Sequence, residues 1–344
     1  MIRSYSVRID VIRNNSHVLS LSPAIDPMID CNSESEIKMS MSGVFYDDPR
    51  VSWMTDELRP YQIIDGIEHS VGIFPIGTMT KSVDENGVAT VSVEAYDRSL
   101  YLKQKKTEEV LHFSAGTNYM KVIEQLMVQS GIVRYIATPT KETLSVDRED
   151  WDIGTSYLTI INTLLGEINY NNVWFNSDGI AILQPIRQPS AANIAHQYSE
   201  LDEIRVLQRQ NAIEADVFDA PNVFIAICDN PDLDAPLTST ATNDSMISPI
   251  SVEARGRRIV KLVRVDNIAS QDALDDYVKT LCFQSMMSAE VATVYTANLP
   301  GHGVYDTVAI NHPDIEGVFE EVSWSLVLAP GKTMTHKLRR LIMV

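Results

Sequence analysis

The sequence predicts an α+β protein, mainly β, in which two small β-barrel domains flank a middle α/β module. Three observations lead to this fold class. Apolar and polar residues alternate near both ends of the chain, whereas two stretches between them carry apolar residues at helical spacing. The 344 residues also exceed what one hydrophobic core usually serves. We therefore divide the chain into residues 1–105, 106–210 and 211–344, with a helix inserted near 270–287.

Short alternating runs open the chain. Residues 2–13 and 33–44 alternate apolar and polar side chains, and residues 61–67 and 72–76 supply two further short strands. Several short strands separated by turn residues are typical of a barrel or a sandwich. The first run contains Asp10 and indicates a strand, not a signal peptide, so we expect the chain to fold in the cytoplasm of the cell that makes it.

A hairpin within residues 74–103 is the clearest single element. Asn86 and Gly87 accept a positive φ at both central positions of a tight turn, whose twist suits its flanking strands. After the turn, Val91, Val93 and Ala95 fall on one face of the strand. We expect this hairpin to form one wall of the first barrel.

The middle of the chain has helical spacing. Thr117 is expected to cap a first helix that ends at Gly131, and Thr155 is expected to cap a second helix. The second helix carries an apolar stripe, formed by Leu158, Ile161, Leu164, Leu165 and Ile168. Residues 173–182 then predict a hairpin, and residues 134–138 a further strand. Helices followed by a hairpin indicate a compact α+β module.

The last part returns to alternation. Residues 230–249 are rich in Pro, Asp, Ser, Thr and Asn, and are expected to form an exposed loop. Ser270 is expected to cap a helix whose first turns are acidic, as the helix dipole favours. Strands are predicted at 213–218, 222–227, 259–265, 290–297, 307–311, 317–328 and 333–342. In the last of these, Met334, His336 and Leu338 share one face.

The net charge of the chain argues against nucleic-acid binding. The chain has 28 basic and 46 acidic residues, a formal charge of −18, which opposes close binding to a phosphate backbone. Residues 212–250 contain no Lys or Arg. A basic cluster follows, made of Arg255, Arg257, Arg258, Lys261 and Arg264. These segments form either a solvated strand and loop or the two complementary halves of a contact between subunits.

Metal-binding motifs are absent from the sequence. The histidines are scattered and show no HExxH or HxH spacing: His17, His69, His112, His196, His302, His312 and His336. We expect His302 and His312 to lie on turns and to be structural. Asp229, Asp232 and Asp234 lack the spacing, central Gly and final Glu of an EF-hand. The cysteines Cys31, Cys228 and Cys282 are too few and too far apart for a disulfide framework, and we expect buried or unreactive thiols.

Catalytic motifs are absent as well. The sequence has no GxSxG elbow, no phosphate-binding loop and no GxGxxG. Neighbouring acids such as Asp47 with Asp48 and Glu320 with Glu321 could serve a glycosidase, yet 46 acids produce such neighbours by chance. The sequence therefore predicts a protein that is not an enzyme, with no catalytic residue, no cofactor-binding residue and no metal ligand.

Three stretches carry a resemblance to a known family. They are VDENGVATVSVEAYDRSLYLKQK, which leads into the helical block; WDIGTSYLTIINTLLGEINYNNVWFNSDGIAILQP, residues 151–185; and the final part with APNVFIAI, HGVYDTVAI and FEEVSWSLVLAPGKTMTHKLRRL. The chain resembles the phage-tail baseplate hub family, which also serves contractile bacteriocins and has relatives in type VI secretion spikes. Together the stretches span nearly all of the chain.

The resemblance implies a homotrimer in which each subunit contributes two tube-like barrels. Six barrels would then match the hexameric tail tube, while the opposite side keeps the threefold symmetry of the central spike. The implied partners are the tail tube protein, the central spike protein, the tape-measure protein and baseplate wedge proteins, with no sequence-specific nucleic acid and no membrane anchoring. The implied location is the tail baseplate of a virion or bacteriocin particle that is made in the host cytoplasm.

Other functions stay open at this point. One is the tail-tip hub of a non-contractile phage, which shares the implied fold. A second, from a different class, is a peptidoglycan-degrading hydrolase of the baseplate. A third is a carbohydrate-binding adhesin built from β-domains. Activity on peptidoglycan and binding to glycans distinguish the last two from a structural hub.

Overall fold

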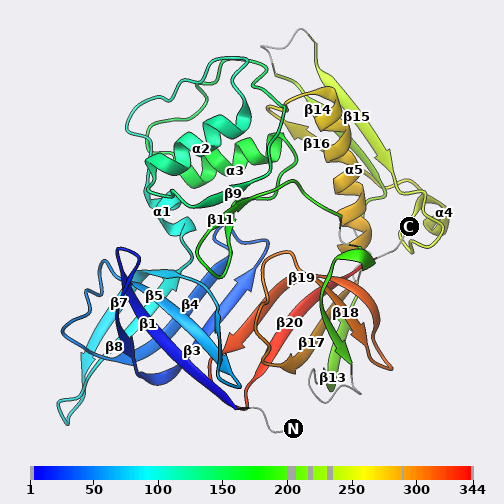
Figure 1. Ribbon diagram of the computed structural model, residues 1–344. Coiled ribbons are helices and arrows are strands. Elements are labelled where there is room, and N and C mark those ends of the chain that lie inside the picture. Colours follow the sequence, from blue (N-terminus) through cyan, green and yellow to red (C-terminus); the bar gives the residue numbers. More distant parts are fainter. Residues whose placement is uncertain are drawn as a thin grey trace.

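The two ends of the chain meet in one large sheet. The computed structural model describes residues 4–188, 190–199, 207–215, 220–230, 235–288 and 290–341. A 14-stranded sheet takes strands from both ends of the chain, and two three-stranded sheets accompany it. The protein is mainly β with a smaller share of helix, as the sequence predicted (Figure 1).

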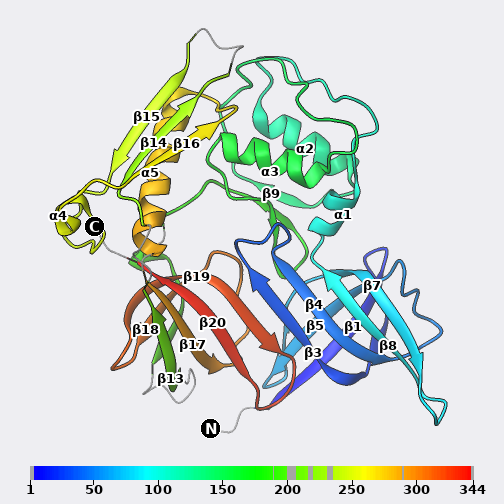
Figure 2. The same cartoon turned by 180° about the vertical axis from the view of Figure 1, so that it is seen from behind.

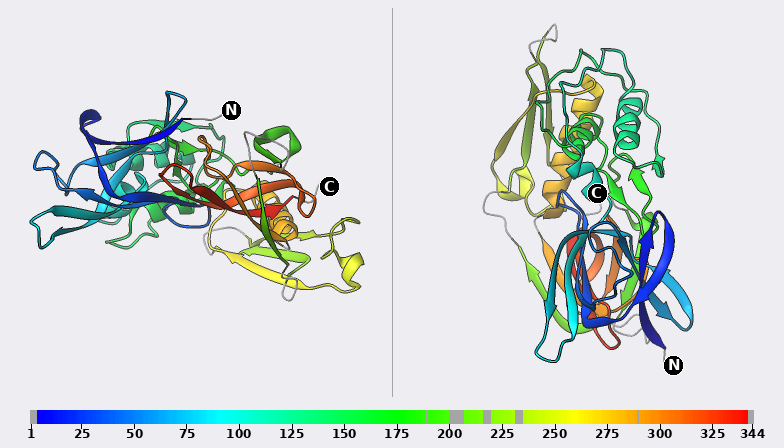
Figure 3. Two further views of the ribbon diagram at one scale, coloured as in Figure 1. Left: turned by 90° about the horizontal axis from the view of Figure 1, so that it is seen from below. Right: turned by 90° about the vertical axis from the view of Figure 1, so that its left-hand side faces the viewer.

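The first β region contains eight strands. They are β1 (Tyr5–Arg13), β2 (Ser16–Leu21), β3 (Pro23–Asn32), β4 (Met39–Tyr46), β5 (Glu57–Ile64), β6 (Ile67–Ser70), β7 (Phe74–Val83) and β8 (Ala89–Tyr96). Their order is β2-β1-β5-β7-β8-β4-β3, and β6 pairs with β5. Ile9, Leu58 and Phe74 are fully buried inside this region. The region curves strongly, as the right-hand view of Figure 3 shows.

Strands β2 and β3 were missed by the sequence analysis. Asn14 and Asn15 have φ of 50° and 59° in the tight turn between β1 and β2, a conformation that asparagine tolerates. Strand β3 contains Pro23 and Pro27, and its register with β4 shifts twice. Proline is mostly excluded from strand interiors, so these residues hid a strand that accommodates them at irregular positions.

The predicted hairpin is confirmed as β7 and β8, and its buried face is confirmed at Val91, Val93 and Ala95. The predicted tight turn was wrong. Within the loop only Gly87 has a positive φ, 79°. The backbone N–H of Asp84 donates to the carbonyl of Val88 over 3.0 Å. The Asp84 carboxylate also accepts from the N–H groups of residues 86 and 88, so a side chain closes a longer loop.

The second β region contains six strands. They are β12 (Ile194–Ser199), β13 (Leu207–Glu214), β17 (Val291–Ala297), β18 (Thr307–Asn311), β19 (Glu316–Val327) and β20 (Thr333–Arg340). Strand β12 was not predicted; it pairs parallel with β18, while the other pairs in this region are antiparallel. The predicted strand at 213–218 corresponds to the end of β13, and residues 216–218 lie outside the described residues.

Strand β19 joins the two β regions. It pairs antiparallel with β3, with Ser323 opposite Asn32 and Val327 opposite Met28. The whole path runs β13-β17-β20-β19-β3-β4-β8-β7-β5-β1-β2, so the described strands form an open path that ends at β13 and β2. The structure therefore confirms a mainly β fold but does not confirm two separate closed barrels. The regions share one backbone hydrogen-bond ladder.

The middle module packs helices against a small sheet. Its elements are α1 (Ser99–Gln104), α2 (Tyr119–Gln129), β9 (Tyr135–Ala137), α3 (Tyr157–Glu167), β10 (Trp174–Phe175) and β11 (Ala181–Leu183). Strand β11 pairs parallel with β9 and antiparallel with β10. Ile161 and Leu165 are fully buried in its core, as the predicted stripe requires.

The predicted caps of α2 and α3 are each wrong by one residue, whereas Ser270, the predicted cap of the helix at residues 271–288, accepts from the N–H of Ala273 over 3.2 Å. Asn118, not Thr117, caps α2 by accepting from the N–H of Met120 over 3.1 Å. Ser156, not Thr155, caps α3 by accepting from the N–H of Thr159 over 3.1 Å. Asn and Ser are better N-caps than Thr, so in both places residue type favoured the observed cap over the neighbouring threonine that was predicted. Gly131 follows the first helix with φ of 82°, as expected.

An insertion interrupts the second β region. It contains β14 (Val223–Cys228), β15 (Leu237–Thr242), α4 (Val252–Arg255), β16 (Val260–Val265) and α5 (Gln271–Ser288). Strand β14 lies between β15 and β16 in a sheet of its own, and α5 packs on one face of that sheet (Figure 2). The predicted strands at 222–227 and 259–265 and the helix near 270–287 exist, but these strands do not join the large sheet. The predicted loop at 230–249 contains β15.

The domain boundaries at 105/106 and 210/211 stay predictions. Strand β12 precedes residue 210 and nevertheless pairs with β18, so the second β region draws on residues from both sides of that boundary. Cys31, Cys228 and Cys282 are buried free thiols. Among the described residues, the helices lack the combination of length and apolar character that crossing a membrane requires.

Candidate functional site

The acidic neighbours considered from the sequence do not converge on a site. Asp47 binds Lys81 and accepts from the indole of Trp53, whereas Asp48 pairs with Arg50 over 2.7 Å. Asp232 and Asp234, weighed as calcium ligands, lie outside the described residues.

Glu320 and Glu321 also point apart. They are successive residues of β19, so their side chains emerge on opposite faces of the sheet. Glu320 lies 3.9 Å from Arg339 at the partly exposed face, while the Glu321 side chain is only 1% exposed. The paired carboxylates of a glycosidase are therefore not present at these positions.

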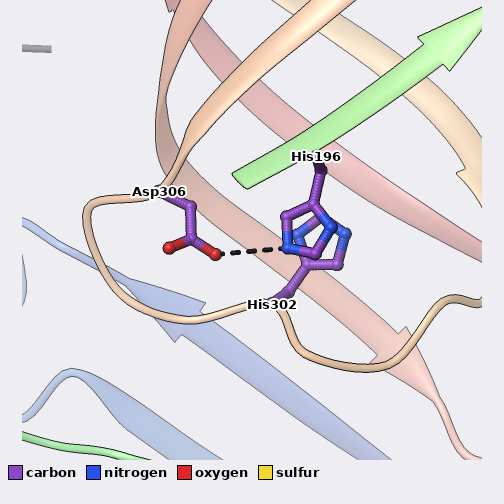
Figure 4. Close-up of side chains that lie close together, drawn as sticks. All are labelled: His196, His302 and Asp306. Atoms are coloured by element: carbon purple, nitrogen blue, oxygen red, sulfur yellow. Dashed lines mark ion pairs between the residues drawn. The ribbon is translucent and has the colours of Figure 1, made fainter. Parts of the chain in front are cut away.

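Glu321 instead belongs to a cluster that the sequence analysis missed, which we call the histidine–carboxylate cluster. It comprises His196 on β12, His302 and Asp306 from the segment between β17 and β18, Glu321 on β19 and His336 on β20. Figure 4 shows three of its members, with the His196 ring lying over the His302 ring. Residues that are more than 100 positions apart meet here because the strands of the second β region bring them together.

Glu321 forms the inner part of the cluster. Its Oε2 lies 2.8 Å from Nδ1 of His302, and its Oε1 accepts from Nδ1 of His336. The second nitrogen of each imidazole meets a hydroxyl: Nε2 of His302 lies 2.7 Å from the Tyr198 hydroxyl, and Nε2 of His336 lies 2.7 Å from Thr296 Oγ1. A carboxylate that binds two Nδ1–H groups fixes the tautomer and orientation of both rings.

Burial and charge act in opposite directions on these groups. Burial lowers the pKa of His302, and Glu321 only partly offsets this effect. Burial alone would raise the pKa of Glu321, but the electrostatic attraction and hydrogen bonds of the His302 and His336 rings lower it to about 2. Glu321 is therefore an anion at neutral pH, held by two imidazoles.

The outer part of the cluster is less completely bonded. The His196 ring stacks on His302 with centroids 3.7 Å apart and planes 13° apart. Its Nε2 is buried and lies 3.4 Å from Oδ2 of Asp306, but makes no hydrogen bond within the described part of the chain. Oδ2 of Asp306 accepts from the N–H of Gly303 over 2.7 Å, which fixes the carboxylate. One imidazole nitrogen thus faces a fixed carboxylate without a good hydrogen bond.

A cavity of about 220 Å³ adjoins the cluster at His302 and Asp306. Its walls come from both β regions and from the loop between β10 and β11, and include Trp174, whose indole nitrogen is buried without a hydrogen-bond partner among the described residues. The cavity gives the cluster space on one side. In chemical terms, the arrangement can hold charge, transfer protons between imidazoles, or bind a cation through nitrogen and oxygen.

Sequence reasoning had only one usable signal for this cluster. It placed His336 between Met334 and Leu338 on one face of the last strand, and all three are buried. It also expected His302 to lie on a turn, and His302 does lie in the segment between β17 and β18, with a nearly buried side chain. No local spacing connects His196, His302 and His336, so a motif search has nothing to detect.

Comparison with known proteins places the fold. No family model matches the sequence, and no curated protein matches it. Among solved structures, a tail protein from Neisseria meningitidis MC58 matches with a TM-score of 0.69 at 13% identity, over 97% of both chains. The chain has a phage tail-protein fold. The match covers both β regions, the middle module and the insertion, so the whole architecture is shared.

Further structures share this tail-protein fold. The 43 kDa tail protein of prophage MuSo2 from Shewanella oneidensis matches with a TM-score of 0.67 at 10% identity, over 98% of both chains. Prophage tail protein gp18 from Listeria monocytogenes EGD-e gives 0.61 at 13% identity, over 96% of this chain and 94% of that one. An E. coli type VI secretion component, described as similar to T4 tail proteins gp27 and gp5, gives 0.52 at 8% identity, over 97% of this chain and 77% of its own.

Proposed function

We propose that the chain is a structural, non-enzymatic hub of a phage-tail or bacteriocin baseplate. In this role it forms a homotrimer that adapts the hexameric tail tube to the trimeric central spike. The observation that carries the proposal is the full-length match to the N. meningitidis tail protein, in which 97% of each chain is covered. At 13% identity this likeness establishes the fold, and the role follows as our inference from it.

Two β regions in each subunit support a symmetry-adapting role. Three subunits would present six curved β regions around one axis, which is the number that a hexameric tube requires. The sheet ends at β2 and at β13, and among the described strands each of these pairs with one neighbour only. The outer edges of β2 and β13 could pair with strands of the next subunit, which would protect these edges from aggregation.

Charge supports a contact between subunits in the insertion. Arg257, Arg258, Lys261 and Arg264 are exposed, and within the described part of the chain they form no ion pair. The neighbouring segment 212–250 has no Lys or Arg. Unpaired cations on one subunit and acids on the next would steer the subunits into register. The net charge of −18 would also give an anionic channel that does not hold passing DNA.

The partners that fit this role are the tail tube protein, the central spike protein, the tape-measure protein and baseplate wedge proteins. The chain would act at the tail baseplate of a virion or bacteriocin particle.

Light scattering of the purified protein, alone and with its spike protein, tests the proposal. We expect a mass three times the 38.4 kDa of one chain, or a 3:3 complex once the spike is added. The double variant Lys261→Glu with Arg264→Glu should weaken the trimer, and the trimer should also weaken as salt rises. Lys121→Glu with Lys141→Glu, which changes exposed cations of the middle module, is the matched control and should leave assembly intact.

Two outcomes contradict the proposal. One is a monomer at every concentration, both alone and with the spike. The other is a clearing band on a peptidoglycan zymogram, which would identify a hydrolase.

A further inference from the structure

The outer part of the histidine–carboxylate cluster has the composition of a metal site. One nitrogen from each of His196 and His302 and one oxygen of Asp306 lie within 4.8 Å of one another. Ligands of one tetrahedral ion at about 2.0–2.2 Å lie roughly 3.3–3.6 Å apart. An imidazole binds a metal in the plane of its ring, and the rings of His196 and His302 are stacked with planes 13° apart, so the His196 ring must turn out of this stack before both nitrogens face one ion. Two imidazoles and a carboxylate suit zinc and neighbouring divalent transition metals better than calcium or magnesium.

The hydrogen bonds indicate which atoms would bind. The Nδ1–H group of His302 is bound to Glu321, so Nε2 of His302 carries the lone pair of the ring, which the Tyr198 hydroxyl meets in this structure. A carboxylate behind a metal-bound histidine is a common arrangement, because it fixes the tautomer and makes the ring a stronger ligand. Glu321 already occupies that place. The Tyr198 hydroxyl, 2.7 Å from the same Nε2, would release this bond when a metal enters.

The clearest unmet hydrogen-bonding need lies between His196 and Asp306. Nε2 of His196 is buried, makes no hydrogen bond with any described residue, and faces Oδ2 of Asp306 at 3.4 Å, as the dashed line in Figure 4 shows. The N–H of Gly303 fixes the same carboxylate in this direction. A buried nitrogen without a partner is costly, and a cation between the two groups would satisfy both.

We propose that His196, His302 and Asp306 bind one divalent transition-metal ion, with Glu321 as the residue that positions His302. The ion keeps an open coordination position toward the adjoining cavity of about 220 Å³, where water completes the coordination. The metal ties β12 to the segment between β17 and β18. These pieces are separated by the whole insertion in the sequence, so the site stabilises the second β region around it.

The test uses the full chain after chelator treatment and gel filtration, with Zn²⁺ and Co²⁺ as probes. We expect isothermal titration to give one ion per chain and thermal unfolding to shift upward with Zn²⁺, because an ion that binds only the folded state stabilises it. Glu321→Gln changes a residue that only positions a ligand, and should weaken the affinity for Zn²⁺ by roughly 10–100-fold. His196→Gln and Asp306→Asn each remove a ligand, and should weaken the affinity for Zn²⁺ at least as much.

His312→Gln is the matched control. His312 is also buried, lies 3.8 Å from Asp314, and has an Nε2 without a partner among the described residues, but it lacks a second histidine. The affinity of the His312→Gln variant for Zn²⁺ should equal that of the wild-type protein. Equal binding by the wild type and His196→Gln, or an equal loss in His312→Gln, overturns the proposal.

The visible spectrum of Co²⁺ in the wild-type protein decides the case even if a variant fails to fold. Strong tetrahedral absorption supports nitrogen and oxygen ligation by the chain, whereas the weak spectrum of hydrated Co²⁺ contradicts it. This experiment needs only the isolated chain, so its result does not depend on whether the baseplate proposal is correct.

Discussion

The first and second β regions share one sheet but fill their interiors with different chemistry. The first region encloses most of an apolar core that includes Ile9, Leu58 and Phe74 and extends to Trp324 and Met334 of the second region. Its buried ion pair between Arg98 and Glu57, 2.6 Å apart, lies where α1 begins and the middle module meets the sheet. The second region instead places Glu321 between two imidazoles in its interior, and the apolar core beside it is smaller.

This difference shows which interactions fix the side-chain arrangement in each of the two regions. Apolar burial is non-directional, so the first region tolerates small changes in side-chain placement. Buried ionisable groups must be paired with good geometry, since an unpaired charge costs several kcal/mol. The second region therefore depends on a few directional bonds that hold β12, β19, β20 and the segment before β18 together.

The largest expected effect comes from removing the acceptor at the centre of the second region. Glu321→Ala leaves two buried imidazoles without their shared partner, and should destabilise the metal-free protein by about 4 kcal/mol. Urea unfolding followed by circular dichroism measures this change. Glu320→Ala, on the opposite face of the same strand, should change the free energy of unfolding by no more than about 1 kcal/mol. If Glu321→Ala and Glu320→Ala lower the free energy of unfolding equally, the second region does not depend on the buried hydrogen bonds of Glu321.

The next largest effect is expected in the apolar core of the first region. Leu58 is fully buried, so Leu58→Ala removes apolar contacts and leaves a cavity that costs about 3 kcal/mol. Thermal unfolding at two pH values measures it. Because no ionisable group is involved, the loss should be the same at both, whereas the loss caused by Glu321→Ala should depend on pH.

The smallest effect concerns the rim of the first region, where Asp56 accepts from both Nε and a terminal nitrogen of Arg13 at 2.7 Å. Burial raises the pKa of Asp56, but hydrogen bonds from Arg13 and Ser52 outweigh this and hold it below its ordinary value. A lowered carboxyl pKa contributes stability above the ordinary value of about 3.9, and that stability disappears as pH falls through the folded-state pKa.

Asp56→Asn should therefore reduce the acid sensitivity of the protein below about pH 4. Chemical unfolding at pH 7 and pH 3 checks it. If Asp56→Asn and the wild type lose the same free energy of unfolding between pH 7 and pH 3, the ion pair between Arg13 and Asp56 does not contribute to the acid sensitivity.

Local pattern accounts for much of the fold. Alternation identified β1, β16, β17 and the three final strands, because a half-buried strand must alternate whatever it pairs with. The spacing of Ile161 and Leu165 identified α3 for the same kind of reason. Pattern failed at β3 and β12, where prolines or polar residues interrupt the alternation while the sheet supplies hydrogen bonds from neighbouring strands.

By itself, the sequence determined the secondary structure of most segments, the mainly β composition and the resemblance to tail proteins. Only the tertiary structure decided that β3 pairs with β19, that β14 to β16 form a separate sheet, and that His196, His302, Asp306, Glu321 and His336 meet. The physical reason is that periodicity is a property of neighbours along the chain. Which strand edges pair, and which distant side chains then share a buried space, is decided by packing across the whole molecule.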